Sequence, residues 1–397
     1  MLTIAIAIVA GLLLLGLIFQ DAFEVMLLPR RVTRRWRLVR LYFQGTWAVW
    51  AALGRRMKPG ARRERFLSIF GALSMMGLFG LWSVGVIVAF GLLQWAAQQW
   101  NGAPAASGLL EQTYLSGVTF FTLGDGVVTP HTPPARLITV VEAASGFGMI
   151  AVVIGYLPVL YQLFSRREAH VIQLDGRAGS PPTATTMLRR HAESNGLDKL
   201  DELLRSWEIW GADLLESHLS YPMLAYYRSQ HDDQSWLAAV CAVMDVCALI
   251  LVGVEEVKPL QARMTFAMAR QVVVEMARSL GVTAALTPGA ARLDHESFEK
   301  MLAVFEEVGL HWNGGPEAEE ALVTIRATYE PLVEGLAEYL LTPLSGWVAA
   351  DHASDHWERG ARGIIARRLI DGLASGAIDT ETAPKAKRGL MRRLRDG

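Results

Sequence analysis

Residues 119–126 read Thr-Phe-Phe-Thr-Leu-Gly-Asp-Gly and lie between two long apolar segments, 66–100 and 137–164. Each apolar segment is long enough to cross a bilayer as a helix. The stretch between them carries Gly124 and Gly126, and glycine allows backbone angles that a Cβ atom forbids. The pattern predicts two membrane helices joined by a short re-entrant loop. A glycine-rich turn between two unrelated helices is the alternative.

Such a loop is suited to contact with a cation. Backbone carbonyls in closely spaced rings can replace the water around a permeating ion, and the Thr122 hydroxyl can add one more ring of oxygen atoms. One chain supplies only one side of each ring. The pattern therefore requires four copies around an axis and predicts a homotetramer.

Residues 66–165 resemble the pore module of the potassium-channel superfamily, in which most filters read Thr-Val-Gly-Tyr-Gly-Asp. Here residues 122–127 read Thr-Leu-Gly-Asp-Gly-Val, so Asp125 replaces the usual aromatic residue and Val127 replaces the usual acid. The filter is most similar to that of bacterial non-selective sodium–potassium channels. The resemblance implies a pore helix at 109–121. It also implies an ion-coordinating filter formed by Thr122, Leu123, Gly124, Asp125 and Gly126.

The function that this resemblance implies is a tetrameric pore-loop cation channel that conducts the monovalent cations K⁺ and Na⁺. Asp125 cannot make the packing of an aromatic side chain, so we expect a wider upper filter and weak rejection of sodium. A ring of acids near the mouth attracts divalent ions, which makes Asp125 a candidate position for Ca²⁺. Two alternatives stay open: a strictly potassium-selective channel, and a non-conducting membrane signalling protein with a channel-like domain.

The second apolar segment holds the candidate gating residues. Gly146 lies twenty residues beyond Gly126, where the resemblance places the hinge of the inner helix, and Gly148 matches as well. Pro158 removes one helical hydrogen bond and is expected to bend this helix near its far end. A membrane proline without a gating role is the alternative. We interpret Glu142 as a hydrogen-bonding support of the pore loop.

The distribution of arginine predicts the topology. Residues 2–28 are apolar enough to span a bilayer, and they lack the basic start and small-residue cleavage site of a signal peptide. Arginine-rich stretches follow at 30–40 and 55–65, and Arg166 and Arg167 follow the last apolar segment. Positive loops stay in the cytoplasm. We therefore expect a multi-pass protein of the cell (inner) membrane, with its amino terminus outside and its carboxyl-terminal domain in the cytoplasm.

The linker between the two arginine clusters contains a short apolar stretch, 42–53, with Trp47 and Trp50. It is too short to cross a membrane and is predicted to form an amphipathic helix in the inner interface. Packing of this helix against the protein's own domain is the alternative. The arginine clusters are expected to bind anionic membrane lipid.

Residues 175–186 are rich in Gly, Pro and small polar residues, and 169–186 are expected to form a linker. Beyond them the repeated i, i+3, i+4 apolar spacing predicts a helical domain over 187–376. Residues 236–254 are almost apolar enough to form a further membrane helix, but Asp245 lies in the middle, which favours a core helix of this domain. The last residues, 377–397, are basic and are predicted to be a disordered tail.

The sequence therefore predicts an all-α membrane protein, with three transmembrane helices, a re-entrant pore helix and filter loop, and a cytoplasmic α-helical domain. The expected divisions are a first transmembrane helix (1–29), a basic cytoplasmic linker (30–65), the pore domain (66–168), a linker (169–186), the helical domain (187–376) and the tail (377–397).

We expect no enzymatic activity, no cofactor and no metal beyond the permeant cations. His352 and His356 are spaced four apart, as metal ligands on a helix can be, but lack an obvious third ligand. A net charge of −1 gives no indication of nucleic-acid binding. Cys241 and Cys247 are the only cysteines and are expected to be buried, reduced thiols. A regulatory ligand of the helical domain is conceivable, and the sequence does not identify it.

Overall fold

The computed structural model describes residues 1–26, 38–100, 108–193, 196–229, 234–285 and 292–349. These residues form helices and contain no strand. The first group of helices comprises α1 (Leu2–Met26), α2 (Leu38–Arg55), α3 (Ala61–Trp100), α4 (Leu109–Phe120) and α5 (Pro133–Ala178). A second group comprises α6 (Ala184–Glu193), α7 (Leu200–Ser220), α8 (Trp236–Val252), α9 (Pro259–Leu280), α10 (His295–Glu307), α11 (Pro316–Ala327) and α12 (Glu330–Leu340), with two short 3₁₀ turns, η1 (Leu197–Lys199) and η2 (Pro222–Tyr226).

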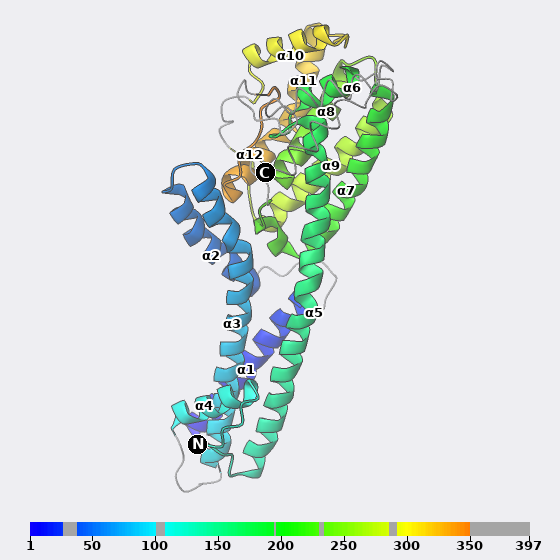
Figure 1. The fold of residues 1–397 in the computed structure, drawn as a ribbon. Helices are drawn as coiled ribbons and strands as arrows, with labels where there is room; N and C mark the ends of the chain where they lie inside the picture. The colour runs from blue at the N-terminus through cyan, green and yellow to red at the C-terminus, as the bar shows by residue number, and fades with distance from the viewer. Residues whose placement is uncertain (27–37, 101–107, 194–195, 230–233, 286–291, 350–397) are drawn as a thin grey trace, which may run out of the picture.

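Three helices of the described residues, α1, α3 and α5, are long and apolar enough to cross a membrane. Figure 1 shows that α4 and the amino terminus lie together at one end of these helices, whereas α6–α12 gather at the other end. We call residues 184–349 the distal domain. The expected fold, three long apolar helices with a separate helical domain, is confirmed.

The first helix packs along α3. A Cβ atom at Gly11 would lie 2.9 Å from the carbonyl oxygen of Ala89, so the two backbones approach closely here. Near the other end of α1 the buried Asp21 carboxylate accepts hydrogen bonds from Trp82 Nε1 (3.0 Å) and from the Val39 amide (3.3 Å). These contacts fix α1 against α3 and against the start of α2.

The linker expected at 169–186 is mostly helical, which corrects its predicted bounds. α5 continues through Pro158 to Ala178 without a break, because Val171, Leu174 and Ala178 extend one buried face into the distal domain. It ends at Gly179, whose φ of 84° and ψ of 177° lie outside the helical region. The Gly179 amide still donates the last helical hydrogen bond, to the Asp175 carbonyl. Only the turn 179–183 separates α5 from α6. α5 therefore leads directly into the distal domain.

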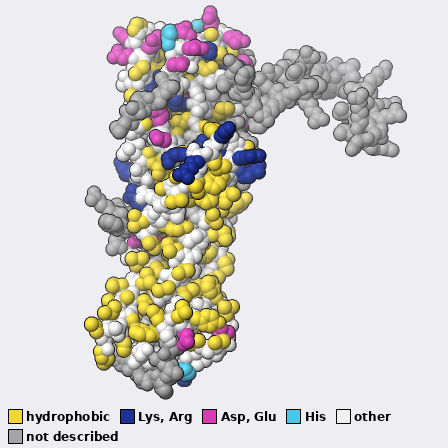
Figure 2. All heavy atoms as spheres, turned by 90° about the vertical axis from the view of Figure 1, so that its left-hand side faces the viewer, with side chains coloured by type: hydrophobic (Ala, Val, Ile, Leu, Met, Phe, Trp, Pro, Cys, Tyr) yellow, Lys and Arg dark blue, Asp and Glu magenta, His cyan; other side chains and the backbone are white. Residues whose placement is uncertain are grey.

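The apolar stretch 42–53 lies in α2, which packs against the protein's own domain, whereas its place in the membrane interface stays a prediction. One face of this helix is buried by the protein itself, and Trp47 Nε1 donates to the Tyr339 carbonyl of α12 at 2.9 Å. The opposite face leaves Leu41, Val49 and Leu53 exposed. Figure 2 shows apolar side chains over the lower part of this side of the molecule, a band of Lys and Arg above them, and acidic side chains at the distal end. α2 thus packs with one face against the rest of the protein and exposes apolar side chains on the other.

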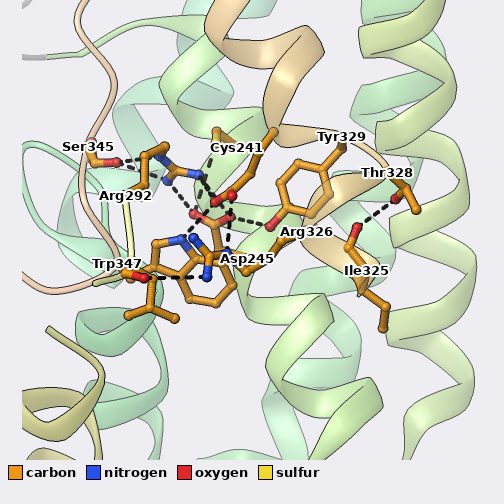
Figure 3. A network of polar contacts seen from close by, with 11 residues as sticks. Cys241, Asp245, Arg292, Ile325, Arg326, Thr328, Tyr329, Ser345 and Trp347 are labelled. Carbon is orange, nitrogen blue, oxygen red and sulfur yellow. Dashed lines mark hydrogen bonds and ion pairs between the residues drawn. The ribbon is translucent and has the colours of Figure 1, made fainter. Parts of the chain in front are cut away.

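The helix with Asp245, α8, is the core of the distal domain, as expected. Nearly all of its residues are buried, and Asp245 accepts a hydrogen bond from Arg292 Nη2 at 2.6 Å and one from the Tyr329 hydroxyl at 2.6 Å. Arg292 also contacts Glu330 at 3.2 Å. Figure 3 shows this network between α8, the segment before α10 and α12. An acid with these partners tolerates burial in a protein core, which accounts for its place in an apolar helix.

Other boundaries differ slightly from those expected. α3 begins at Ala61, before the expected start of the pore domain at 66, and the pore helix ends at Phe120. Cys241 and Cys247 are buried and unbridged, as expected. The basic tail at 377–397, the end of the helical domain beyond 349, and both His352 and His356 lie outside the described residues.

Candidate functional site

The re-entrant stretch begins with α4, which packs between α3 and α5. Gly91 of α3 allows this approach, since a Cβ atom there would lie 2.7 Å from Thr113 Oγ1. After α4 the chain reverses through two backbone hydrogen bonds, Thr122 N–H to the Thr119 carbonyl (3.0 Å) and Leu123 N–H to the Val118 carbonyl (2.8 Å). The start of the predicted filter is therefore attached to the end of the pore helix.

The backbone angle φ changes sign from residue to residue along the predicted filter. φ is positive at Thr122 (57°), Gly124 (62°) and Gly126 (71°), whereas Leu123 and Asp125 between them are not among the residues with positive φ. Positive φ at every second residue is unusual for a loop, since residues other than glycine rarely adopt it. A row of carbonyl oxygens that faces a dehydrated cation is one arrangement that needs such a backbone.

The predicted filter is exposed in the single chain. Leu123 is 71 % exposed and Val127 is 75 % exposed, and a Cβ atom at Gly124 or Gly126 would meet no atom within 4 Å. The two glycines are therefore required by their positive φ and not by crowding. An exposed polar backbone between apolar helices has to be covered by other protein or by a water-filled path.

Asp125 is held on the side of the pore helix. Its Oδ2 accepts a short hydrogen bond from the Tyr114 hydroxyl of α4, and its Oδ1 accepts one from the Val127 amide at 3.2 Å. Tyr114 was not among the residues singled out from the sequence. A tyrosine on the predicted pore helix, close in sequence to an acid in the predicted filter, was the sequence feature that could have indicated this bond.

Glu142 is fully buried behind the pore helix. It accepts a short hydrogen bond from the Ser116 hydroxyl of α4, and Ser116 also contacts the Ile87 carbonyl of α3 at 2.7 Å. Close by, the Gln94 amide group of α3 lies 2.8 Å from Thr139 Oγ1 of α5. These polar side chains join α3, α4 and α5 in the layer behind the filter. Of this group only Glu142 could be recognised from the sequence, because its partners are ordinary polar residues on other helices.

The three gating candidates occupy different surroundings. A Cβ atom at Gly146 would lie 2.4 Å from the Phe120 carbonyl oxygen, so this glycine permits contact between α5 and the end of α4. Gly148 meets nothing within 4 Å. Pro158 lies inside α5, which remains helical on both sides of it. The structure thus gives Gly146 a packing role, and its role as a hinge stays a prediction.

A cleft of about 460 Å³ opens beside α5, just beyond Pro158. Val159 and Leu163 of α5 form part of its apolar lining, and an ion pair between Arg166 and Asp213 of α7 (2.6 Å) forms part of its polar lining. Such a mixed lining is typical of small-molecule sites. Within the described ranges no group of three or more His, Cys, Asp or Glu side chains gathers as a metal site.

Comparisons with known proteins agree with this geometry over the pore segment. Residues 82–162 match a family described as "Ion channel". An uncharacterised membrane protein of Bacillus subtilis, YdjJ, is 27 % identical over 150 residues, which are 37 % of this chain and 42 % of the relative. The chain thus matches less than half of that relative's length. No solved structure matches the chain.

The matched segment runs from the middle of α3 through α4 and the filter to a point just beyond Pro158. The chain therefore carries a segment similar to a two-helix, potassium-channel-like pore domain within a membrane protein. Transport of ions is the kind of function that this similarity indicates, in preference to enzymatic catalysis.

Proposed function

We propose that this protein is a homotetrameric pore-loop channel that conducts monovalent cations, both K⁺ and Na⁺. The alternating sign of φ over 122–126 is the observation that carries the proposal. A simple turn between two helices has no need of three left-handed residues at alternate positions, one of them a threonine. A row of carbonyls facing a permeating ion does need them.

Fourfold assembly follows from the exposure of the filter. A single chain leaves the backbone of 122–126 uncovered beside helices that have apolar outer surfaces. Uncovered backbone groups are very unfavourable in a bilayer. Four copies around an axis would cover them and complete the rings of oxygen atoms. Leu137, Phe147 and Ile154, which are exposed on α5, would then face other copies or lipid.

Weak discrimination between sodium and potassium follows from Asp125. The lower filter is supported by main-chain bonds to α4, whereas the upper filter depends on the two bonds that Asp125 makes to Tyr114 and Val127. Asp125 occupies the position at which an aromatic side chain of the filter would otherwise pack outward and brace the upper rings. Fewer ordered rings weaken the rejection of sodium. Four Asp125 carboxylates near the mouth would also attract Ca²⁺ as a permeant or blocking ion.

The proposed orientation places the filter end outside the cell and the distal domain in the cytoplasm. The exposed basic residues Arg55, Arg56 and Lys58 lie at the end of α2 and in the turn before α3, at the end of α3 remote from the filter. Basic loops are retained in the cytoplasm, and at this level they would contact anionic headgroups. Cysteine probes near residue 104 should react from outside the cell, and cysteines that replace the exposed Arg56 or Lys58 should not.

The test is cation flux from purified protein in liposomes. The wild type should pass K⁺ and Na⁺ at comparable rates, and Gly124→Ala should abolish both fluxes because alanine is strained at positive φ. Asp125→Tyr combined with Val127→Asp should shift the channel toward potassium. A wild type that rejects sodium would establish a strictly potassium-selective channel. A wild type without flux would refute conduction and favour a non-conducting signalling protein.

A further inference from the structure

The segment 221–229, which follows α7 and contains η2, lies between the distal ends of the two pore helices α3 and α5. It contacts both of them and also α2 and α12. We propose that this segment, here called the coupling segment, transmits movements of the distal domain to the inner helix of the pore. The proposal rests on the channel function proposed above.

Arg167 of α5 binds the coupling segment through its main chain. The guanidinium donates to the Leu224 carbonyl at 2.9 Å and to the Tyr227 carbonyl at 2.7 Å. Its charge is balanced by Glu168, at 2.9 Å, and Glu168 accepts a short hydrogen bond from the Ser229 hydroxyl. Arg167 is 3 % exposed. A buried ion pair with several further bonds strongly disfavours separation of its parts.

The same segment also contacts α5 on the other side of Pro158. The Tyr156 hydroxyl bonds Met223 Sδ at 3.3 Å, and the Tyr156 and Tyr221 rings lie 5.4 Å apart. The inner helix is therefore attached to one segment both before and after its proline. A change of bend at Pro158 would have to break or rearrange one of these two sets of contacts.

On the side away from α5, the coupling segment packs against the outer helix α3. A Cβ atom at Gly71 would lie 2.8 Å from Cδ2 of Tyr227, so the ring rests directly on the backbone of α3. Farther along, Arg228 forms an ion pair with Glu64 of α3 at 2.6 Å. The coupling segment therefore acts as a spacer that sets the distance between α3 and α5 at this level.

The coupling segment is also bonded to α12 of the distal domain. Arg228 Nη2 donates to the carbonyls of Leu340 (2.8 Å) and Leu341 (2.7 Å), at the end of α12. The Tyr226 and Tyr339 hydroxyls are 2.9 Å apart, and the Tyr226 ring stacks on Phe43 of α2 at 5.7 Å. A shift of α12 relative to α7 thus pulls on the same residues that hold α3 and α5.

Coupling between two such sites typically changes an equilibrium by roughly fivefold to 150-fold. The variant Gly71→Ala, which forces the Tyr227 ring away from α3, tests the coupling between the distal domain and the pore helices. Gly80→Ala is the matched control on the same helix, because a Cβ atom at Gly80 meets nothing within 4 Å. In planar bilayers Gly71→Ala should change the open probability by at least about fivefold and leave the sodium-to-potassium permeability ratio unchanged. Gly80→Ala should behave as the wild type.

A second pair of variants addresses the other side of the segment. Arg167→Lys keeps the charge but cannot reach two carbonyls and Glu168 at once, so it should change the open probability in the same way. Arg166→Lys is its control, because the Arg166 side chain is 65 % exposed and pairs only with Asp213 in the described contacts. Open probabilities of Gly71→Ala and Arg167→Lys within twofold of their controls would overturn the proposal, as would an altered permeability ratio.

A readout that does not need conduction separates this proposal from the channel function. In detergent, amide hydrogen exchange of 152–168 and 221–229 should be faster in Gly71→Ala than in Gly80→Ala, because the two segments are held by shared contacts. Absence of flux in the wild type would refute the channel function alone. Equal exchange in the two variants would refute the coupling segment, whether or not the protein conducts.

Discussion

Replacing Gly146 with alanine inserts a methyl group where α5 touches the end of the pore helix. The added Cβ atom would lie 2.4 Å from the Phe120 carbonyl oxygen and 3.1 Å from two further Phe120 backbone atoms. Backbone cannot rotate away as a side chain can, so either α5 or the start of the filter has to move. We expect the variant to lose stability.

The size of the loss follows from two opposing effects. Overpacking at a well-packed contact costs about 1–3 kcal/mol, and a backbone neighbour places this site at the upper end, about 3 kcal/mol. Alanine in place of glycine inside a helix stabilises the folded state by about 1 kcal/mol. The expected net loss is about 2 kcal/mol per subunit. Gly148→Ala, which meets no atom within 4 Å, should instead be neutral or stabilising by up to about 1 kcal/mol.

Chemical unfolding of the purified protein in detergent, followed by tryptophan fluorescence, measures both variants against the wild type. Opposite signs for Gly146→Ala and Gly148→Ala would establish Gly146 as a packing glycine. A hinge alone needs flexibility and no close contact, so it predicts that the two alanines act alike. Equal unfolding midpoints for the two variants would refute the packing argument drawn from Phe120.

Three further results are expected. Tyr114→Phe frees one oxygen of Asp125 to turn toward the mouth of the filter, so external calcium should block sodium flux at lower concentration than in the wild type; unchanged block would show that the Tyr114 bond does not orient the carboxylate. Arg292→Met leaves Asp245 buried without its cationic partner and should destabilise the distal domain by about 3–5 kcal/mol, seen as a lower midpoint of chemical unfolding, whereas an unchanged midpoint would contradict the assigned role of the pair. Burial, and next the charge of Arg167, lower the pKa of His218 from 6.5 to about 3. Between these values only the unfolded chain binds the proton, so the stability of the fold falls as the pH drops below 6.5. From pH 7.5 to 5.5 the wild type should lose about 1.4 kcal/mol more stability than His218→Gln, and equal losses would show that His218 titrates normally.

The parts of the molecule that the sequence predicts well are those set by local rules. Bilayer thickness requires long apolar runs, and the described structure contains three such helices. The positive φ values at 124 and 126 fall on glycines that were singled out for this freedom. Asp245 was enough to place α8 in a protein core, because an isolated acid is unfavourable in lipid.

The parts that could not be predicted depend on residues far apart in the chain. Arg166 and Arg167 are identical neighbours that both mark the end of an apolar segment, yet one is exposed and the other is a buried link to the coupling segment. Helix orientation decides this, and helix orientation depends on the packing of the whole domain. Glu142 and Ser116 are likewise 26 residues apart and meet only because α4 folds back against α5.

The two ends of the filter are held by different kinds of contact, and this difference bears on selectivity. Thr122 and Leu123 are bonded through their amides to carbonyls of α4, and these bonds do not depend on side-chain identity. At the other end Asp125 and Val127 are joined by bonds that require the Asp125 carboxylate, with Tyr114 as the second partner. In the proposed channel, mutation at 125 should therefore alter the upper rings and leave the lower ones in place. The proposal then predicts that selectivity can be changed at Asp125 without loss of conduction, because the main-chain bonds at Thr122 and Leu123 remain.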